Sequence, residues 1–368
     1  MIRLMILLAV SMCLAYCSQH DILVVPVTKK FKIDIPLILM ILILSCFAGL
    51  RTSYNDTDTY VEAFKIAPTI SEYIDSSPEF FSNPLFYLMQ SFFRHIIMNN
   101  YHLFFFTIAL FTISCILWFI RKHSSNFPFG ILIFFCIGMI LVPMSAMKQG
   151  MAIAILLLGV NQLLKKRILL FYVFLTIAVL FHAYAILFVI LPFFLGRPWT
   201  IFTYIAVGTV AFVLFSFEST ITGFLSVAEE AGKNLTEEAL FESQGINLFR
   251  LTVFAVPPLL LFIFQEILNP SYTKNRQLFA NMSILSFLIM SMGIFSAANL
   301  FGRSAVYFEI GTILILPWII EEIFNKESRA TAYVFVGGCY LTYFAYMVKG
   351  FSHEYKAIDV VEFIQTLI

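Results

Sequence analysis

The chain has 368 residues, of which 60% are hydrophobic and 12% are charged, and its mean hydropathy is +0.90. Soluble domains carry roughly twice this charged fraction, so the composition excludes a soluble globular protein. The net charge of +1 gives no indication of a nucleic-acid partner. The apolar runs are continuous rather than alternating, which disfavours a transmembrane β-barrel and predicts an all-α polytopic membrane protein.

Because about 20 apolar residues cross a bilayer as one helix, the length allows about 10–13 transmembrane helices, which we expect to form a single domain over residues 1–368. We interpret the first apolar run as a retained span and not as a signal peptide. In chain order, the predicted spans cover residues 2–17, 33–50, 101–120, 127–144, 148–164, 168–181, 183–195, 199–217, 248–266, 277–298, 304–320 and 330–348.

Short basic connections indicate which ends of the spans are cytoplasmic. A consistent assignment requires that residues 168–195 form a hairpin turning near His182. It also requires that residues 83–98 form a re-entrant or surface-lying amphipathic helix. Residues 51–100 and 218–247 then form external loops. The predicted cytoplasmic residues are Lys29, Lys30, Lys32, Arg121, Lys122, Lys165, Lys166, Arg167, Lys274, Arg276, Lys326 and Arg329.

The segment Arg51–Tyr60 directly follows an apolar run and is dense in polar groups. Asp56 and Asp58 are two residues apart, so in an extended segment both side chains would point the same way. Such a pair can bind a divalent cation, or one carboxylate can act as a general base. A solvated turn rich in Asp, Asn, Thr and Ser is the plainer interpretation.

Two further polar sites lie among apolar residues. Lys148 and Gln149 begin an apolar helix, where the lysine either extends to the headgroup region or meets a lipid diphosphate. His182 lies inside a long apolar run, and an ionisable group within a membrane is a functional candidate. A neutral histidine bonded to a backbone carbonyl at the hairpin turn is the alternative.

Arg250 and Arg303 each begin a predicted span, and Tyr307 follows Arg303 by one turn. Guanidinium groups suit bidentate contacts with phosphate, although a single interfacial arginine is usually an anchor. The chain has no phosphate-binding loop, dinucleotide fingerprint or serine-hydrolase elbow. Its six cysteines show no spacing typical of a zinc site or of a disulfide framework, so we assign no metal-ligating residue, and the metal dependence of the Asp56–Asp58 pair stays open.

The order of these motifs resembles that in the Wzy-type polysaccharide polymerases, in particular their EpsG-like branch. That family has an arginine and a (G)-x-D-x-x-x-Y type segment after an early span, as in Arg51–Tyr60 here. Lys148 begins a match to an R-Q-x-x-A helix start, and Ala178 begins a match to A-x-x-x-H-x-(S/A)-A that contains His182. The chain departs from the family pattern at Lys148, where arginine is usual, and at Asn55, where glycine is common.

The resemblance implies a GT-C-like membrane glycosyltransferase in the bacterial inner (cytoplasmic) membrane, with its active site facing the periplasm. Such a polymerase joins undecaprenyl-diphosphate-linked repeat units into O-antigen or a related surface polysaccharide and releases undecaprenyl diphosphate. Its implied partners are the lipid-linked donor and acceptor, the lipid bilayer and a chain-length regulator. No cofactor is needed, because the diphosphate leaving group already activates the donor.

This chemistry suggests three sets of site residues. Cations bind the leaving diphosphate, a carboxylate or histidine acts as the base, and further polar or aromatic side chains orient the sugars. The diphosphate-binding candidates are Arg51, Lys148, Arg250 and Arg303. The catalytic candidates are Asp56, Asp58 and His182. The orienting candidates are Gln149, Tyr54, Tyr60 and Tyr307.

Two other functions stay open on the sequence. An O-antigen ligase shares the donor and the leaving group with a polymerase. A transporter or flippase of lipid-linked sugars would favour charges at mid-membrane and inverted repeats, whereas here the charges gather at one predicted face and the sequence shows no repeat.

Overall fold

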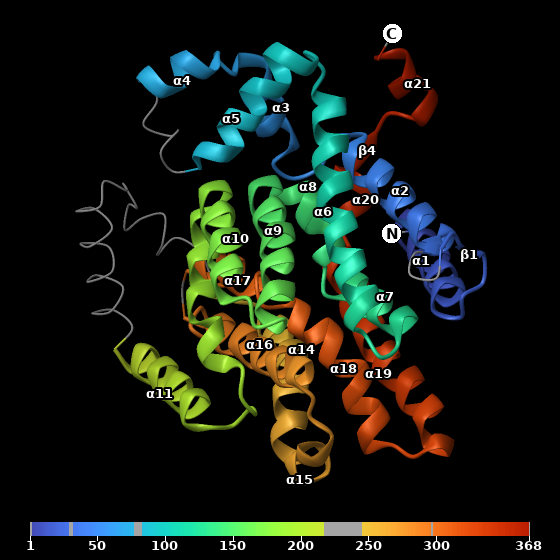
Figure 1. The fold of residues 1–368 in the computed structure, drawn as a ribbon, viewed down its shortest axis with the longest axis vertical. Helices are drawn as coiled ribbons and strands as arrows, with labels where there is room; N and C mark the ends of the chain where they lie inside the picture. Colours follow the sequence, from blue (N-terminus) through green and yellow to red (C-terminus); the bar gives the residue numbers. More distant parts are fainter. Residues whose placement is uncertain (1, 29–31, 77–82, 217–244, 296, 368) are drawn as a thin grey trace. The chain divides into compact units, whose positions relative to one another are not determined.

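The computed structural model describes residues 2–28, 32–76, 83–216, 245–295 and 297–367 (Figure 1). Helices form nearly all of this part of the chain, and its strands form only two short antiparallel pairs. The predicted all-α polytopic membrane protein is therefore confirmed. The chain divides into two compact units: the first unit is Met1–Val189 with Phe344–Ile368, and the second unit is Ile190–Tyr343.

The first unit is built around apolar helices that pack in sequence, with α2 against α6, α6 against α9 and α9 against α10. Their ends carry capping residues. The Asp34 carboxylate accepts a hydrogen bond from Leu37 N at the start of α2, and the last turn of α6 holds Arg121, whose charge complements the helix dipole. These helices are α1 (Ile2–Gln19), α2 (Ile35–Gly49), α6 (Tyr101–His123), α9 (Met147–Leu164) and α10 (Ile168–Phe181).

The predicted span over 127–144 is broken in the structure. Helix α7 (Phe127–Cys136) ends before Gly138, and the segment Met139–Ser145, which contains α8 (Val142–Ser145), continues at an angle of 69°. Gly138 has a φ of 83°, which favours glycine, and a Cβ there would lie 2.9 Å from Met347 Sδ. The break thus depends on this glycine.

Within residues 51–100, the described part that follows β3 (Arg51–Ser53) is mostly helical. It forms α3 (Thr57–Ile66), α4 (Ile70–Ser76), α5 (Pro84–Phe92) and a π-helical segment, Phe93–Ile97. Helix α5 continues into the π-helical segment, and residues 84–97 together are shorter than the roughly 20 residues of a span. That this segment does not cross the membrane stays a prediction. Arg94 anchors the π-helical segment, because its Nη1 donates to Ala67 O at 2.6 Å.

The predicted break at His182 is confirmed. Helix α10 ends at Phe181, the backbone of His182 is extended, and Ala183–Phe194 then forms a 3₁₀-helical segment. The reversal of direction that a hairpin requires stays a prediction. Most of the predicted external loop 218–247 falls in residues 217–244, which lie outside the described residues.

Among the described residues, three helices are long and apolar enough to cross a membrane, or up to six if each bent pair forms one span. The sequence-based count of about 10–13 is higher. It includes apolar runs that form shorter helices, and also α16 (Lys274–Ser291) and α19 (Lys326–Met347), which are long enough but are not among these candidates. These shorter apolar helices are Ile35–Gly49, Ile168–Phe181, Ala183–Phe194 and Ile201–Leu214.

The second unit is centred on α16, which packs against α14, α17 and α18. Gly311 allows α18 to approach α16 closely, because a Cβ there would lie 2.6 Å from Phe279 O. Ser283 and Thr312 share a buried hydrogen bond of 2.9 Å across the same contact. The unit contains α11 (Ile201–Phe215), α14 (Leu248–Ile263), α15 (Gln265–Leu268), α16 (Lys274–Ser291), α17 (Ala298–Val306) and α18 (Ile310–Ile323), and α19 (Lys326–Met347) leads back to the first unit.

The C-terminal residues return to the first unit and pair with the segment that follows α2. Strand β4 (Lys356–Ala357) is antiparallel to β3 (Arg51–Ser53), and Ile358 N donates to Leu50 O at 3.0 Å. The other pair joins β1 (Val24–Pro26) and β2 (Lys32–Asp34) between α1 and α2. The C-terminal helices are α20 (Phe351–Glu354) and α21 (Val360–Gln365).

Candidate functional site

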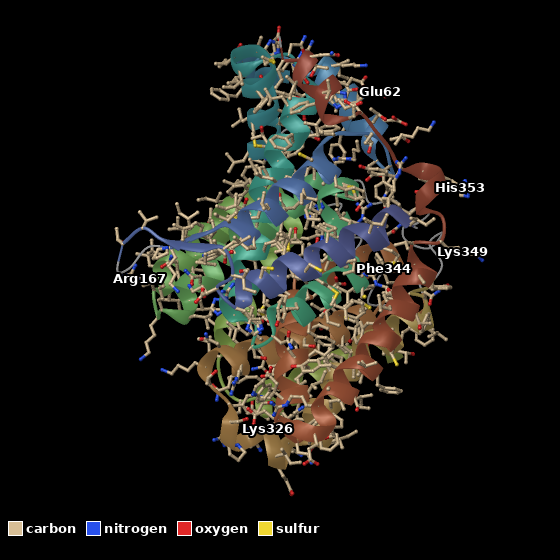
Figure 2. The ribbon with its side chains drawn as sticks, turned by 90° about the vertical axis from the view of Figure 1, so that its right-hand side faces the viewer. Glu62, Arg167, Lys326, Phe344, Lys349 and His353 are labelled. Carbon is tan, nitrogen blue, oxygen red and sulfur yellow. The ribbon has the colours of Figure 1, made fainter. Side chains whose placement is uncertain are left out.

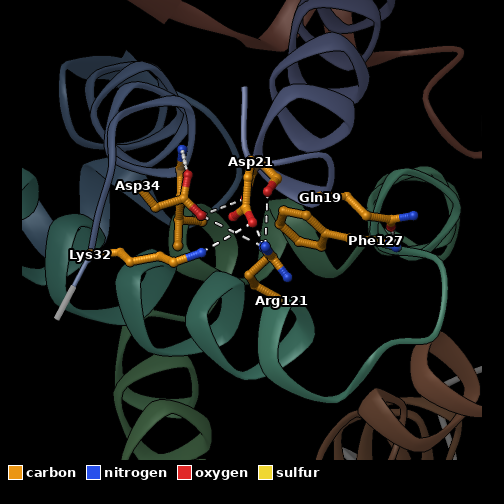
Figure 3. Close-up of polar contacts among 8 residues, drawn as sticks. Gln19, Asp21, Lys32, Asp34, Arg121 and Phe127 are labelled. Carbon is orange, nitrogen blue, oxygen red and sulfur yellow. Dashed lines mark hydrogen bonds and ion pairs between the residues drawn. The ribbon is translucent and has the colours of Figure 1, made fainter. Parts of the chain in front are cut away.

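The first unit has two chemically distinct ends. At one end, Arg121 Nε donates to Ser18 Oγ at 2.7 Å and lies 3.6 Å from Asp34 Oδ2 (Figure 3). Asp34 precedes α2 and Arg51 follows it, so the length of α2, about 22 Å, separates them. Predicted cytoplasmic and predicted external cations therefore lie at opposite ends of one helix.

Two exposed side chains mark the same separation. Glu62 lies on α3, which follows the Arg51 segment, and Arg167 lies beyond the last residue of α9. Figure 2 shows the two side chains at opposite ends of the first unit. Lys122, next to Arg121, donates to the Asn161 side chain near the end of α9, whereas Lys148 lies in the first turn of that helix. Helix α9 thus repeats the asymmetry of α2.

Arg51 is fully buried, with 0% of its surface exposed. Its Nε donates to Thr57 Oγ1 at 3.0 Å and its Nη1 to Ala48 O at 2.6 Å, and its Cζ lies 4.6 Å from the centroid of the Phe105 ring. Its Nη2 is buried and has no hydrogen-bond partner among the described residues. Burial lowers the pKa of Arg51 to about 10, against the opposing effect of Tyr60. One donor of this guanidinium is therefore available to an anionic oxygen.

The two aspartates lie at the start of a helix and not in an extended segment, so the expectation that they point the same way is wrong. The backbone of Asn55 has a left-handed conformation, with a φ of 46°. Asp56 is the N-cap of α3, and Asp58 lies in the first turn of that helix. Residues two apart on a helix do not face each other. Asp58 is exposed, whereas Asp56 is half-buried and raises the pKa of Tyr60. Of the two carboxylates, Asp56 is thus the one that lies close enough to Tyr60 to affect its pKa.

Tyr60 connects α3 to the start of α9. The backbone N–H groups of Lys148 and Met147 donate to its hydroxyl and lower its pKa, but burial has the larger effect and raises the pKa to about 12. The Tyr60 hydroxyl therefore keeps its proton well above physiological pH and can donate a hydrogen bond to a substrate oxygen.

Lys148 is half-buried against aromatic rings of α5. Its Nζ donates to Tyr87 Oη at 2.8 Å and lies 4.3 Å from the Tyr87 ring centroid and 5.3 Å from that of Phe86. The next residue, Gln149, is buried, with 2% of its surface exposed. Tyr87 and Phe86 are not among the predicted site residues, because a predicted surface helix gives no indication that its aromatic face contacts the start of α9.

His182 follows the last turn of α10 and is half-buried. Its ring centroid lies 5.1 Å from that of Tyr184, with the rings nearly perpendicular. Helix α10 packs against α5, the helix that carries Tyr87. His182 is therefore placed at the end of a helix that borders the aromatic wall around Lys148.

The C-terminal segment adds aromatic side chains to the Arg51 segment. Tyr355 Oη donates to Phe47 O at 2.7 Å, and the Tyr355 ring stacks on those of Phe47 and Phe351, which also stack on each other. The Tyr54 ring lies 5.0 Å from that of Phe351. No local pattern indicates this contact, because Tyr355 and Phe47 are 308 residues apart in the chain.

The second unit holds the remaining candidates around α17. Arg250 Nη2 lies 3.1 Å from the Glu309 Oε1 atom, and Glu309 is buried, with 1% of its surface exposed. Arg303 lies on α17 and is exposed, whereas Tyr307 is buried. Glu309 is not among the predicted site residues, although an acidic residue inside an apolar run is itself a signal.

The predicted site residues thus form two groups, each within its own unit. The second group contains Arg250, Arg303 and Tyr307. The first group contains Arg51, Tyr54, Asp56, Asp58, Tyr60, Lys148, Gln149 and His182.

No curated protein and no solved structure matches the chain. The family model for EpsG matches residues 34–359, which include the Arg51 segment, Lys148, His182 and the Arg250–Glu309 pair. The match extends over most of the chain and both units, and it connects the chain with polysaccharide biosynthesis at a membrane. The chain is therefore a member of the EpsG family.

Proposed function

We propose that this protein is a Wzy-type polymerase. It joins undecaprenyl-diphosphate-linked repeat units into O-antigen or a related surface polysaccharide at the periplasmic face of the bacterial inner membrane. The observation that carries the proposal is the polar cluster of Arg51, Asp56, Tyr60 and Lys148, at the end of α2 and α9 opposite to Arg121. Membership of the EpsG family supports the same assignment.

We assign binding of the lipid diphosphate to the cationic side chains. Donor and acceptor are each linked to a lipid diphosphate, so two diphosphates take part. The cations of each unit can bind one of them. In the first unit, Arg51 has a buried donor without a partner among the described residues, and Lys148 supplies a second charge. In the second unit, we assign this role to Arg250 and Arg303. Cations that stabilise the negative charge of the departing diphosphate lower the barrier to its release.

We assign the activation of the acceptor hydroxyl to the carboxylate of the cluster. The Asp56 carboxylate takes the proton from a sugar hydroxyl of the acceptor, with Asp58 and His182 as the alternative bases. The hydroxyl oxygen bonds to the anomeric carbon of the donor, and the bond from that carbon to the diphosphate breaks with the electron pair leaving on the diphosphate. Tyr54, Tyr60, Gln149 and Tyr307 orient the sugars.

The reaction needs no cofactor, because the diphosphate leaving group supplies the activation. The partners are therefore the two lipid-linked glycans and the bilayer that holds them. We include a chain-length regulator among the partners, since a polymerase product has a distribution of lengths that a second protein can set.

A deletion strain tests the proposal. We expect it to accumulate single lipid-linked repeat units, and we expect the wild-type gene and Lys65→Met to restore long polymer. Lys65 is an exposed lysine on α3 and serves as the matched control. Lys148→Met and Arg303→Ala should fail to restore long chains although the proteins are present in the membrane.

Other outcomes would contradict the polymerase. Normal long-chain polymer in the deletion strain would exclude it. Long chains that stay on the lipid carrier and do not reach lipid A core would indicate a ligase. Repeat units stranded on the cytoplasmic leaflet would indicate a transporter.

A further inference from the structure

Glu309 is a buried carboxylate in an apolar setting. It lies in the break between α17 and α18, which bend by 60° relative to each other, and only 1% of its surface is exposed. Its neighbours Phe308 and Ile310 are completely buried. Burying a carboxylate costs several kcal/mol unless a partner compensates the charge, so a residue of this kind within a membrane segment has a specific role to explain.

The compensating partner is Arg250. Its Nη2 donates to Glu309 Oε1 at 3.1 Å, and 33% of the Arg250 side chain is exposed. Within the described part of the chain, its Nε and Nη1 atoms make no hydrogen bond. The guanidinium is therefore attached to Glu309 by one nitrogen while its other donors remain available on a partly exposed side.

The surroundings of Arg250 hold its backbone and leave room for its side chain. The Asn247 side chain accepts hydrogen bonds from Phe249 N at 2.8 Å and Arg250 N at 3.3 Å, which fixes the first turn of α14. On α17, a Cβ at Gly302 would lie 3.6 Å from Arg250 Nη1. The guanidinium thus lies over α17 at the residue before Arg303.

We propose that Glu309 is a positioning residue, which holds the Arg250 guanidinium so that its free donors face a substrate diphosphate. The inference rests on the proposed function and extends it to a residue that does not contact the substrate. An unrestrained arginine loses side-chain entropy when it is fixed on a phosphate. A carboxylate that already holds one nitrogen removes part of this cost before the substrate binds.

The test compares Glu309→Gln with Arg250→Met in purified protein. Glutamine keeps an acceptor oxygen and the shape of the side chain but loses the charge. Lipid-linked repeat units extracted from the deletion strain serve as substrate, and inorganic pyrophosphate serves as the binding probe. For Glu309→Gln, we expect about a tenfold loss of kcat/KM and weaker binding of pyrophosphate, with an unfolding midpoint close to that of the wild type.

The double variant separates positioning from a purely structural role. If Glu309 acts through Arg250, the double variant that combines Arg250→Met with Glu309→Gln should have the same kcat/KM as Arg250→Met alone. Its unfolding midpoint should nevertheless be higher than that of Arg250→Met, because the unpaired buried carboxylate is gone. Glu322→Gln is the matched control, since Glu322 lies 3.6 Å from Arg276 in another ion pair of the same unit.

Two results would overturn the inference. In the first, Glu309→Gln binds pyrophosphate as tightly as the wild type, whereas Arg250→Met binds it more weakly. The second is a loss of activity in Glu309→Gln that only follows a lower unfolding midpoint. Failure of the proposed function is a separate result: the wild-type protein would form no polymer from the extracted repeats, while pyrophosphate binding would still report on the positioning of Arg250.

Discussion

Lys148 donates a hydrogen bond from Nζ to Tyr87 Oη at 2.8 Å, and this contact joins the first turn of α9 to α5. The same ammonium group lies 4.3 Å from the centroid of the Tyr87 ring. The lysine is therefore held both by a hydroxyl and by an aromatic face, in a position next to the Tyr60 hydroxyl that the α9 backbone contacts.

Tyr87→Phe removes the hydroxyl and keeps the ring. We expect shorter polymer in the complemented deletion strain, because Lys148 loses the acceptor that directs its Nζ. The unfolding free energy should fall by about 1 kcal/mol or less, the usual contribution of one hydrogen bond. Tyr73→Phe is the control, because the Tyr73 ring lies 5.5 Å from that of Tyr87. Polymer of normal length with Tyr87→Phe would contradict a role for this contact.

Arg51→Lys should destabilise the protein although it keeps the charge. A lysine cannot donate to Thr57 and Ala48 at once while it also lies over the Phe105 ring. We expect a loss on the order of 2 kcal/mol, measured by thermal unfolding in detergent. Thr57→Val removes one acceptor of this arginine together with the hydrogen bond that the Thr57 hydroxyl donates to Tyr54 O, and it should also lower the unfolding midpoint. Equal unfolding midpoints for Arg51→Lys and the wild type would show that the geometry is not needed.

The sequence allowed the polar cluster to be predicted because its residues interrupt apolar runs. Arg51, Tyr60 and Lys148 come together at one end of the first unit as the sidedness of the basic loops indicates. The expectation for the two aspartates failed for a local reason. Asp56 at an N-cap and Asp58 in a first turn are typical of the start of a helix, and this signal was available in the sequence.

Other site residues depend on contacts that a sequence does not display. Tyr355 reaches Phe47 through a strand pair of a few residues, which has no hydrophobic period of its own. Tyr87 contacts Lys148 through the packing of two helices that are distant in the chain. Glu309 differs from both, because its position inside an apolar run marks it directly. The predicted roles of all these side chains stay predictions.

Alkaline pH should destabilise the first unit. Burial raises the pKa of Tyr54, Tyr60 and Tyr355 to about 12, whereas an unfolded tyrosine titrates near pH 10. Between these values the folded state keeps protons that the unfolded chain has lost, so stability is complete below about pH 10 and falls as the pH rises towards 12. Arg51, whose pKa burial lowers to about 10, acts in the opposite direction but is one group against three.

The unfolding midpoint between about pH 9 and pH 12 measures this effect. In Tyr60→Phe the fall with pH should be shallower than in the wild type, because one of the titrating groups is absent. Tyr346→Phe changes an exposed tyrosine and should leave the slope unchanged. Parallel curves for Tyr60→Phe and the wild type would contradict the raised pKa.

The pairing of β3 with β4 predicts that the C-terminal residues are needed for activity. Truncation before Phe351 removes β4 together with Phe351 and Tyr355, whose rings stack on Phe47, so we expect a lower unfolding midpoint and loss of long polymer. A cysteine pair tests the contact itself. Ser53 and Lys356 are opposite each other in the register, and this spacing suits a disulfide.

Ser53→Cys with Lys356→Cys should therefore form a crosslink in a chain whose six native cysteines have been replaced. Ser53→Cys with Lys349→Cys is the control, because Lys349 precedes the strand. Equal crosslinking of both pairs would contradict the register, and normal polymer after truncation would show that the C-terminal strand has no role in the reaction.

We expect the segment Arg51–Tyr60 to face the periplasmic side of the membrane. Asn55 is exposed in the turn before α3, and Lys166 is exposed between α9 and α10 at the opposite end of the first unit. In a cysteine-free background, Asn55→Cys should react with a membrane-impermeant maleimide in intact spheroplasts. Lys166→Cys should react only after the membrane is permeabilised.

The two positions control for each other, because they lie at opposite ends of helix α9 and its neighbours. Undecaprenyl-diphosphate-linked repeat units are joined at the periplasmic face in the proposed reaction, so Asp56 and Lys148 must reach that face. Reaction of Lys166→Cys in intact spheroplasts, with Asn55→Cys protected, would place the cluster in the cytoplasm. The polymerase assignment would then fail together with the roles of Arg51, Asp56 and Lys148, since a cytoplasmic cluster cannot contact these glycans.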